Sequence, residues 1–263
     1  MPGSLKTRNV LGYPIAVTTY ADATSWSMEV AHRGDRAYAV SAANTHVLAH
    51  ARHDQLFGEA LSKFDLICPD GTPLLWSVNA QLPEEEKLEE RVYGPSLMLE
   101  LLKSTEGDSD QSHFFLGGKQ ETLDQLSERF ESNEIAGTYS PPFGEWPVEE
   151  HEKIKALIRE SCARFVWVGL GCPKQEKWIA DHLNSLPPAV YFGIGAAFAF
   201  HAGDVKQAPV FIQKFGMEWL AEICRQYSWH DFEFISLSFD EESDKEKVSK
   251  FLKQQEVGML FLP

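Results

Sequence analysis

Residues 164–176 read RFVWVGLGCPKQE, in which an apolar run is followed by two glycines, a proline and three polar side chains. The run RFVWV is short and almost wholly apolar, which predicts a buried strand. Pro173 suits the first turn of a helix, because the N–H that it lacks would have no partner there. The glycines between them allow the backbone to turn tightly. A strand, a glycine turn and a helix in this order predict a parallel α/β fold.

The same alternation extends outward along the chain. Short apolar runs predict strands, and segments with helical periodicity lie between them. The predicted strands are 38–42, 66–68, 113–116, 134–139, 164–168 and 189–194, and the predicted helices are 45–64, 94–103, 120–130, 148–162 and 173–186. We expect one Rossmann-like α/β domain over residues 1–227, with a mostly parallel sheet flanked by helices, followed by an acidic C-terminal tail over residues 228–263.

The composition is typical of a soluble, acidic globular protein. The chain has 263 residues, 24% of them charged, and a formal net charge of −15. This charge argues against a nucleic-acid partner, because binding to phosphates needs an excess of Lys and Arg. No apolar leader is evident, the longest apolar run (189–200) is too short to span a bilayer, and the four cysteines lack metal-ligand spacing. We therefore expect a cytoplasmic protein with reduced core thiols.

Ligands of open parallel sheets bind beyond the carboxyl ends of the strands. The loops that begin near residues 43, 69, 117, 140, 169 and 193 are therefore the expected place for function. At the turn over 169–176, the N-terminus of a helix offers N–H groups to an anion, which favours a phosphate or sugar-nucleotide cradle over a plain turn. Gly193 and Gly195 follow the next strand, where they would either admit a ligand or permit tight helix packing.

Polar residues follow the first two predicted strands. Asp70 lies between Pro69 and Gly71, where it is either a turn former or a carboxylate able to act as a general base toward a hydroxyl. Asn44 and Thr45 would bind a ligand or cap the following helix. Arg91 would pair with phosphates or with its Glu neighbours.

Other motifs point to no further chemistry. Asp108-Ser109-Asp110 resembles a metal-binding DxD, but it precedes a strand and is expected to be a solvated loop. His46, His50 and His53 have spacing that could hold zinc, but no further ligand is obvious. GxSxG is absent, so a hydrolase nucleophile elbow has no support. We expect no metal site.

Together these segments resemble the WecG/TagA/CpsF family of bacterial glycosyltransferases (glycosyltransferase family 26). The matching stretches run in family order and cover roughly residues 40 to 220. They are AANTHVLAHAR (42–52), FDLICPDGTPLLW (64–76), RVYGPSLM (91–98), FFLGGK (114–119), VGLGCPKQEKWIA (168–180), GIGAAFAFHAGDVKQAP (193–209) and GMEWL (216–220).

The resemblance implies an inverting, metal-independent enzyme that needs no cofactor. Such enzymes move a hexose (N-acetylmannosamine, its uronic acid or glucose) from a UDP-sugar to a sugar on an undecaprenyl-diphosphate carrier, in exopolysaccharide or cell-wall polymer synthesis. By motif match, Asp70 is the implied general base, and Arg91 assists at the phosphates or the acceptor. The implied substrate-binding residues are Asn44, Thr45, Gly71, Gly94, Gly117, Gly169, Gly171, Pro173, Lys174, Gln175, Glu176, Gly193, Gly195, Phe198 and Lys206.

The family acts at the cytoplasmic face of the membrane, which implies a peripheral contact with the inner membrane. Ala42, Gln207 and Glu222 stand where the family usually has Thr, Arg and Arg, and the tail is acidic where the family has a basic, apolar appendage. A non-catalytic relative that binds sugar nucleotides is therefore one alternative. A nicotinamide-dependent Rossmann oxidoreductase is another, which the missing GxGxxG disfavours. An apolar stripe over 211–223 would be core or an interface in a homo-oligomer.

Overall fold

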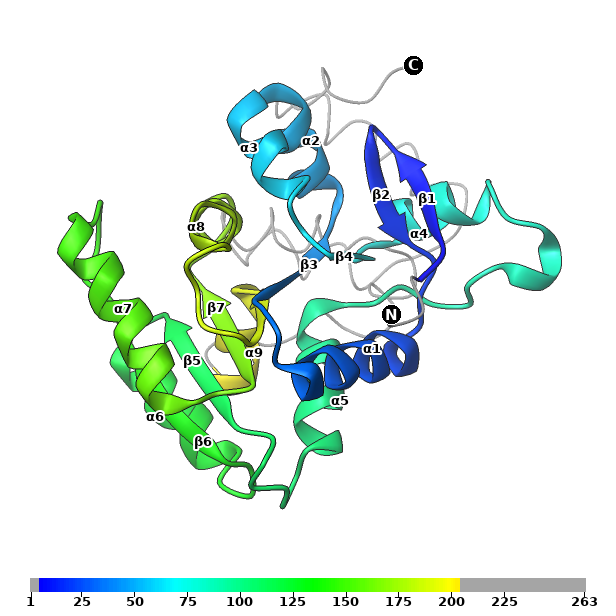
Figure 1. The fold of residues 1–263 in the computed structure, drawn as a ribbon. Helices are drawn as coiled ribbons and strands as arrows, with labels where there is room; N and C mark the ends of the chain where they lie inside the picture. Colours follow the sequence, from blue (N-terminus) through cyan, green and yellow to red (C-terminus); the bar gives the residue numbers. More distant parts are fainter. Residues whose placement is uncertain (1–4, 204–263) are drawn as a thin grey trace, which may run out of the picture. The chain divides into compact units, whose positions relative to one another are not determined.

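The computed structural model describes residues 5–203, and its centre is a six-stranded sheet in which every neighbouring pair is parallel (Figure 1). The strand order is β4-β3-β8-β7-β5-β6. The strands are β3 (Tyr38–Ala43), β4 (Leu66–Pro69), β5 (His113–Gly117), β6 (Ile135–Tyr139), β7 (Phe165–Gly169) and β8 (Val190–Gly193). The predicted α/β class and parallel sheet are confirmed.

Helices cover both faces of the sheet, and the sheet divides the hydrophobic core into two clusters. One core cluster contains buried side chains from α2 (Thr45–His53), α3 (Gln55–Leu61), α4 (Thr72–Asn79), α7 (Val148–Ser161) and α8 (Lys174–His182). The other contains those of α1 (Tyr20–Arg33), α5 (Gly94–Ser104), α6 (Gln120–Arg129) and α9 (Ala196–Ala202). Each strand of this sheet except β6 contributes buried side chains to both clusters, because successive side chains of a strand point to opposite faces.

The predicted helix over 45–64 is wrong in one respect, because the segment forms two helices. The chain breaks at Asp54, whose backbone is extended, and its carboxylate accepts a hydrogen bond from the Phe57 N–H at 3.1 Å. Lys177 also donates to this carboxylate, at 2.7 Å. Asp54 therefore starts a new helix as its N-cap, which an Asp at this position favours.

Several elements lie outside the predicted set. β1 (Thr7–Val10) and β2 (Tyr13–Ala16) form a separate antiparallel pair, and a short 3-10 helix covers Glu84–Glu86. The helices α1, α4 and α9 were also not predicted. The predicted boundary at 227/228, the acidic tail and the apolar stripe over 211–223 lie outside the described residues.

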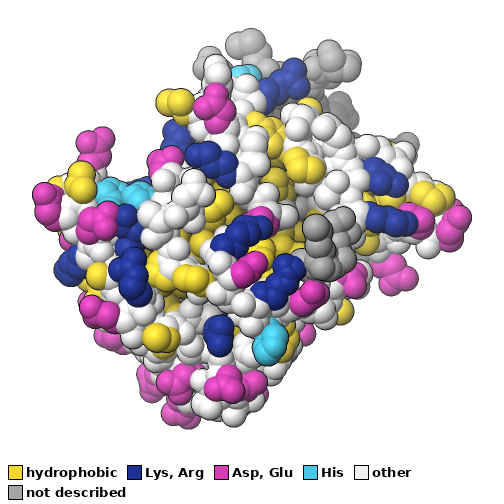
Figure 2. Space-filling view, in the orientation of Figure 1, with side chains coloured by type: hydrophobic (Ala, Val, Ile, Leu, Met, Phe, Trp, Pro, Cys, Tyr) yellow, Lys and Arg dark blue, Asp and Glu magenta, His cyan; other side chains and the backbone are white. Residues whose placement is uncertain are grey.

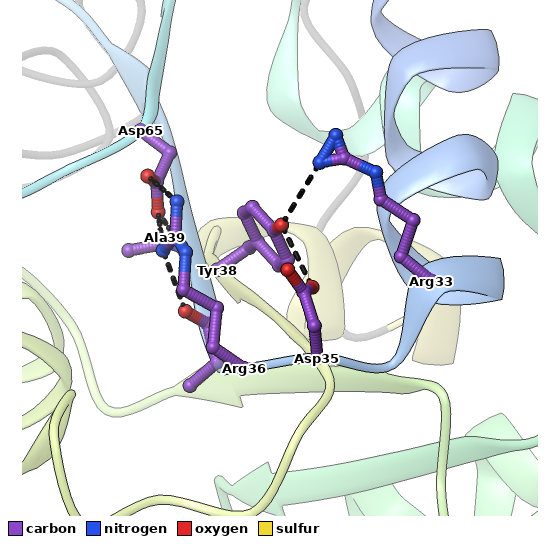
Figure 3. A network of polar contacts seen from close by, with 7 residues as sticks. Arg33, Asp35, Arg36, Tyr38, Ala39 and Asp65 are labelled. Carbon is purple, nitrogen blue, oxygen red and sulfur yellow. Dashed lines mark hydrogen bonds and ion pairs between the residues drawn. The ribbon is translucent and has the colours of Figure 1, made fainter. Parts of the chain in front are cut away.

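A polar network ties β3 to β4 at their amino ends (Figure 3). Arg36 donates to Asp65 with an Nη2–Oδ1 distance of 2.6 Å, and the Ala39 N–H donates to Oδ2 of the same carboxylate at 2.9 Å. Beside them, the Tyr38 hydroxyl donates to Asp35 at 2.9 Å and accepts from Arg33 at 3.4 Å. This network is at the end of the sheet opposite to the predicted functional loops.

Two further expectations concern thiols and membranes. Core thiols are expected for three of the four cysteines; Cys68 is buried, Cys172 is partly buried, Cys162 is exposed, and Cys224 lies outside the described residues. Cys162 ends α7 in a left-handed conformation, which places it at the surface rather than on the strand that follows. Among residues 5–203, every helix is too short or too polar to cross a membrane.

Candidate functional site

The predicted functional loops meet at one edge of the sheet. Because all six strands are parallel, the residues that end them lie at a common edge. These residues are Ala43, Pro69, Gly117, Tyr139, Gly169 and Gly193. The loops that follow them carry most of the predicted site residues.

Asp70 directly follows β4 and is held in place at both its backbone and its side chain. Its N–H donates to the Ala43 carbonyl at 2.8 Å, which continues the pairing of β3 with β4. Its Oδ2 accepts from the Gly94 N–H at 3.1 Å, and its Oδ1 lies 3.8 Å from Arg91 Nη1. The side chains of Arg91 and Asp70 are only 15% and 13% exposed. The structure thus brings together three predicted residues, Asp70, Arg91 and Gly94.

The segment over 91–94 is positioned by α1 as well as by β4. The Val92 N–H donates to the Pro69 carbonyl at 2.9 Å, and the Tyr93 N–H donates to the Tyr20 hydroxyl at 3.0 Å. The Arg91 guanidinium carbon lies 4.7 Å from the centre of the Tyr93 ring, within range of a cation–π contact. Burial raises the pKa of Tyr20, so its hydroxyl stays protonated.

Tyr20 is not among the predicted site residues. A Thr19–Asp22 capping box marks the start of α1 in the sequence, because each side chain accepts from the backbone N–H of the other. That signal could have predicted the helix. It could not have placed the Tyr20 hydroxyl beside residue 93, because this contact joins segments far apart in the chain.

Asn44 and Gly71 adjoin the Asp70 loop. Asn44 caps α2, since its Oδ1 accepts from the Val47 N–H at 3.1 Å, and Thr45 is the exposed first residue of that helix. Gly71 has φ +113°, and a Cβ there would lie 3.7 Å from the Asn44 Cβ. The capping alternative for Asn44 is therefore realised, on a side chain that also borders the loop of Asp70.

A second group of predicted residues surrounds Gln175. Its Oε1 accepts from the N–H groups of Gly171 and Gly195, at 3.1 and 3.0 Å, and its Nε2 donates to Glu176 Oε1 at 2.8 Å. Gln175 and Glu176 are 5% and 1% exposed, and burial raises the pKa of Glu176. Both side chains are therefore enclosed by the protein, and Gln175 joins the loops after β7 and β8.

Close packing explains a third group, Gly117, Gly169 and Phe198. A Cβ at Gly117 would lie 2.5 Å from the Gly169 carbonyl oxygen, and a Cβ at Gly169 would lie 2.5 Å from Phe198 Cδ2. Phe198 is 2% exposed and packs edge-on against Phe115. The space left by these glycines is filled by the chain itself, and their contact with a ligand stays a prediction.

Lys174 points toward the loop that follows β6. Its Nζ donates to the Gly144 carbonyl at 2.7 Å and lies 3.9 Å from the centre of the Trp146 ring. Partial burial lowers the pKa of Lys174. Pro173 precedes it after a cis peptide bond. Lys174 thus starts α8 beside Gln175 but contacts a different loop.

Gly94 connects two sets of predicted residues. We call them the Asp70 group (Asn44, Asp70, Gly71, Arg91 and Gly94) and the Gln175 group (Gly171, Gln175, Glu176 and Gly195). A Cβ at Gly94 would lie 3.6 Å from Asp70 Oδ2 and 3.4 Å from Ile194 Cγ2. Ile194 stands between Gly193 and Gly195, on the loop that Gln175 holds. The two groups therefore adjoin each other at the carboxyl ends of β4, β3, β8 and β7, and Lys206 lies outside the described residues.

The described part of the chain places no set of three or more His, Cys, Asp or Glu side chains where they could hold a metal ion. Asp108 and Asp110 are exposed, as expected of a solvated loop, and the His50 ring stacks on Phe57.

On the face drawn in Figure 2, Lys and Arg side chains are scattered among acidic and apolar ones.

Comparison with known protein families gives one finding that bears on this site. The family model described as the glycosyl transferase WecG/TagA/CpsF family matches residues 8–230. The match includes every described residue of the Asp70 and Gln175 groups.

Proposed function

The chain belongs to the WecG/TagA/CpsF family, whose members are glycosyltransferases of polysaccharide synthesis, and from this we propose that it is an inverting, metal-independent hexosyltransferase. The donor is a UDP-sugar, such as UDP-N-acetylmannosamine, its uronic acid or UDP-glucose. The acceptor is a sugar on a polyprenyl diphosphate, which the enzyme meets through a peripheral contact with the cytoplasmic face of the membrane. The residues of the Asp70 and Gln175 groups form the proposed site.

The observation that carries the proposal is the environment of Asp70. A carboxylate stands at the carboxyl edge of the sheet, little exposed, with a backbone N–H at 3.1 Å and a guanidinium at 3.8 Å. A hydrogen-bond donor and a cation therefore flank this carboxylate, which is a group that can accept a proton. Because one oxygen faces Gly94 and the other faces Arg91, the carboxylate has a fixed orientation, as a general base needs.

The proposed reaction is a single displacement. The acceptor hydroxyl oxygen attacks the anomeric carbon on the face opposite to UDP, and its proton passes to Asp70. The new glycosidic bond forms as the bond from the anomeric carbon to the diphosphate oxygen breaks, and that oxygen leaves with the electron pair. Arg91 and nearby N–H groups would stabilise the charge that develops on the diphosphate. Asn44, which borders the Asp70 loop, would contact the substrate.

The test is UDP release from a panel of UDP-hexoses, with and without a short-chain lipid-diphosphate acceptor, in EDTA. Wild type is compared with Asp70→Asn, which keeps an oxygen to accept from Gly94 but removes the base. Asp65→Asn is the matched control, because Asp65 directly precedes β4 as Asp70 directly follows it. We expect acceptor-dependent release in wild type and Asp65→Asn, and its loss in Asp70→Asn.

Other outcomes have definite meanings. If wild type releases no UDP either in EDTA or with added Mg²⁺, but binds uridine nucleotides in calorimetry, the chain is a non-catalytic relative. If it binds no uridine nucleotide, the proposed donor is wrong. If Asp70→Asn retains full transfer, Asp70 is not the base. If release requires a metal ion and stops in EDTA, the enzyme is not metal-independent.

A further inference from the structure

One side-chain oxygen joins two loops at the centre of the site. Gln175 Oε1 accepts from Gly171 N–H, on the loop after β7, and from Gly195 N–H, on the loop after β8. A carbonyl oxygen has two lone pairs, so these two bonds use its accepting capacity fully. The two loops are therefore held at a separation set by a single atom.

The neighbours of the Gln175 carboxamide fix its orientation. The oxygen faces two N–H donors, and the nitrogen faces the Glu176 carboxyl oxygen at 2.8 Å. If the amide were flipped, its NH2 group would face the N–H groups of Gly171 and Gly195, and its oxygen would face the Glu176 carboxyl oxygen. All three hydrogen bonds would then be lost. The backbone adds a fourth bond, because the Gln175 N–H donates to the Gly171 carbonyl at 2.9 Å.

Glycine at 195 is required by this arrangement. A Cβ there would lie 2.6 Å from Gln175 Oε1 and 3.0 Å from the Gly171 nitrogen. A side chain would therefore push the carboxamide away from both loops. The glycines at 193 and 195 suggest that a ligand approaches the backbone closely. In the structure, the group that lies close to Gly195 is the Gln175 side chain.

The loop after β8 also reaches the candidate base. Ile194 packs beside Gly94, and the Gly94 N–H donates to Asp70. Movement of the loop would therefore change the packing around the Asp70 carboxylate as well as the spacing between the two glycine loops.

We propose that Gln175 is a positioning residue for sugar transfer, which holds the β7–α8 and β8–α9 loops at the spacing that donor binding requires. This rests on the proposed function, in which those loops enclose the donor. Glu176 orients the carboxamide by accepting from its Nε2 at 2.8 Å. Glu176 is 1% exposed, and this burial raises the pKa of its carboxyl group.

The first test removes the carboxamide. Gln175→Met keeps the length of the side chain but makes neither loop bond. Gln55→Met, at the exposed first position of α3, is the matched control. We expect the UDP dissociation constant of Gln175→Met, measured by calorimetry, to rise about tenfold or more. The KM for the donor should rise with it, while the KM for the acceptor changes less.

The second test exchanges the two side chains. Gln175→Glu places two carboxyl groups beside each other. When it is combined with Glu176→Gln, the amide at 176 can donate to the carboxylate at 175, which reverses the direction of the wild-type bond. We expect the single variant to bind UDP weakly and the double variant to recover most of the lost affinity. A merely structural position would show no such recovery in donor affinity. A double variant no better than the single one overturns the proposal.

A third measurement does not depend on the ligand. Hydrogen exchange of the Gly171 and Gly195 amides should be slow in wild type and fast in Gln175→Met, at a temperature where both proteins are folded. Slow exchange in Gln175→Met would show that Gln175 does not hold the two loops together. If Gln175→Met shows fast exchange but binds UDP as tightly as wild type, Gln175 holds the loops together but has no role in donor binding. If wild type binds no uridine nucleotide, the proposed function and the positioning role both fail, and exchange still decides whether Gln175 joins the loops.

Discussion

The backbone N–H of Gly94 donates to the Asp70 carboxylate at 3.1 Å, and so joins the first residue of α5 to the residue that follows β4. Gly94 has little room for a side chain. A Cβ there would lie 3.3 Å from Ala42 Cβ and 3.4 Å from Ile194 Cγ2. We expect Gly94→Ala to displace the start of α5 and to lower kcat at least tenfold, with a loss of about 1–2 kcal/mol in the free energy of unfolding.

Gly137→Ala is the control for this variant. Gly137 is in β6, where a Cβ would lie 2.8 Å from a carbon of the Phe114 ring, so the substitution also crowds the core. It should lower the free energy of unfolding without changing the kcat of the folded enzyme. Denaturant unfolding and initial rates on both variants decide the matter. Wild-type kcat in Gly94→Ala would show that the Gly94 contact does not position the base.

Lys174 is a predicted substrate-binding residue, but from its contacts we expect it to hold the loop after β6 rather than to bind the donor. Its ammonium donates to the Gly144 carbonyl and lies over the Trp146 ring. Phe143 in the same loop is fully exposed, and chymotrypsin cleaves peptide bonds after aromatic residues, so we expect it to cleave there. We expect Lys174→Met to speed cleavage after Phe143, because the loop loses both contacts, and to change UDP affinity by less than about threefold.

The exposed Lys119, at the N-cap of α6, provides the control. Lys119→Met should leave cleavage after Phe143 unchanged. Unchanged cleavage in Lys174→Met, together with a large loss of UDP affinity, would instead place Lys174 at the donor diphosphate.

The sequence predicts the sheet well because its strands are apolar runs bounded by turn residues. All six predicted strands exist, and the loops at their carboxyl ends are where expected. The break at Asp54 is a local event that periodicity does not report, although an Asp is a known N-cap. α4 starts with Thr72-Pro73, a pattern that could have predicted it. β1 and β2 are four residues each and give only a weak signal.

The sequence predicts most of the residues that the structure brings together at the candidate site, but not Tyr20 and not the contacts between them. Local turn chemistry points to Asp70 and to the glycines of both loops. The direction of the Gln175 side chain depends on Gly195, which lies 20 residues away on the loop after β8, and the Tyr20–Tyr93 contact spans 73 residues. Such contacts arise only when the sheet and its helices are packed together.

His113 should make stability depend on pH. Its Nδ1 accepts from the Trp167 indole N–H at 3.1 Å, its Nε2 lies 2.9 Å from the Thr105 hydroxyl, and burial lowers its pKa to about 3. The unfolded chain binds this proton near the ordinary pKa of about 6.5, so the unfolded state takes up more protons as the pH falls below that value. Stability that is present above the unfolded pKa is therefore lost as the pH falls toward 3.

Chemical denaturation at pH 7.5 and pH 5 measures this effect. We expect His113 to account for about 2 kcal/mol of the loss in the free energy of unfolding between these values. Burial also lowers the pKa of His151 and His201, so the contribution of His113 is the difference between wild type and His113→Gln. His32→Gln, on the exposed side of α1, is the control. Equal pH dependence in wild type and His113→Gln would contradict the prediction.

The two carboxylates that flank β4 should differ in what they do, although the same substitution can be made at each. Asp65 accepts from Arg36 and from the Ala39 N–H at the amino end of the strand (Figure 3), and these bonds tie β4 to β3. Asp65→Asn keeps one oxygen for Ala39 but loses the ion pair, and because half of Arg36 is exposed we expect a cost of about 1 kcal/mol. Its kcat should equal that of wild type. Asp70→Asn keeps the bond from Gly94 but loses the charge beside Arg91, so we expect it to cost a similar amount of stability while transfer is lost. A loss of stability without loss of transfer in Asp70→Asn would mean that this carboxylate ties β4 to α5 and takes no part in the reaction.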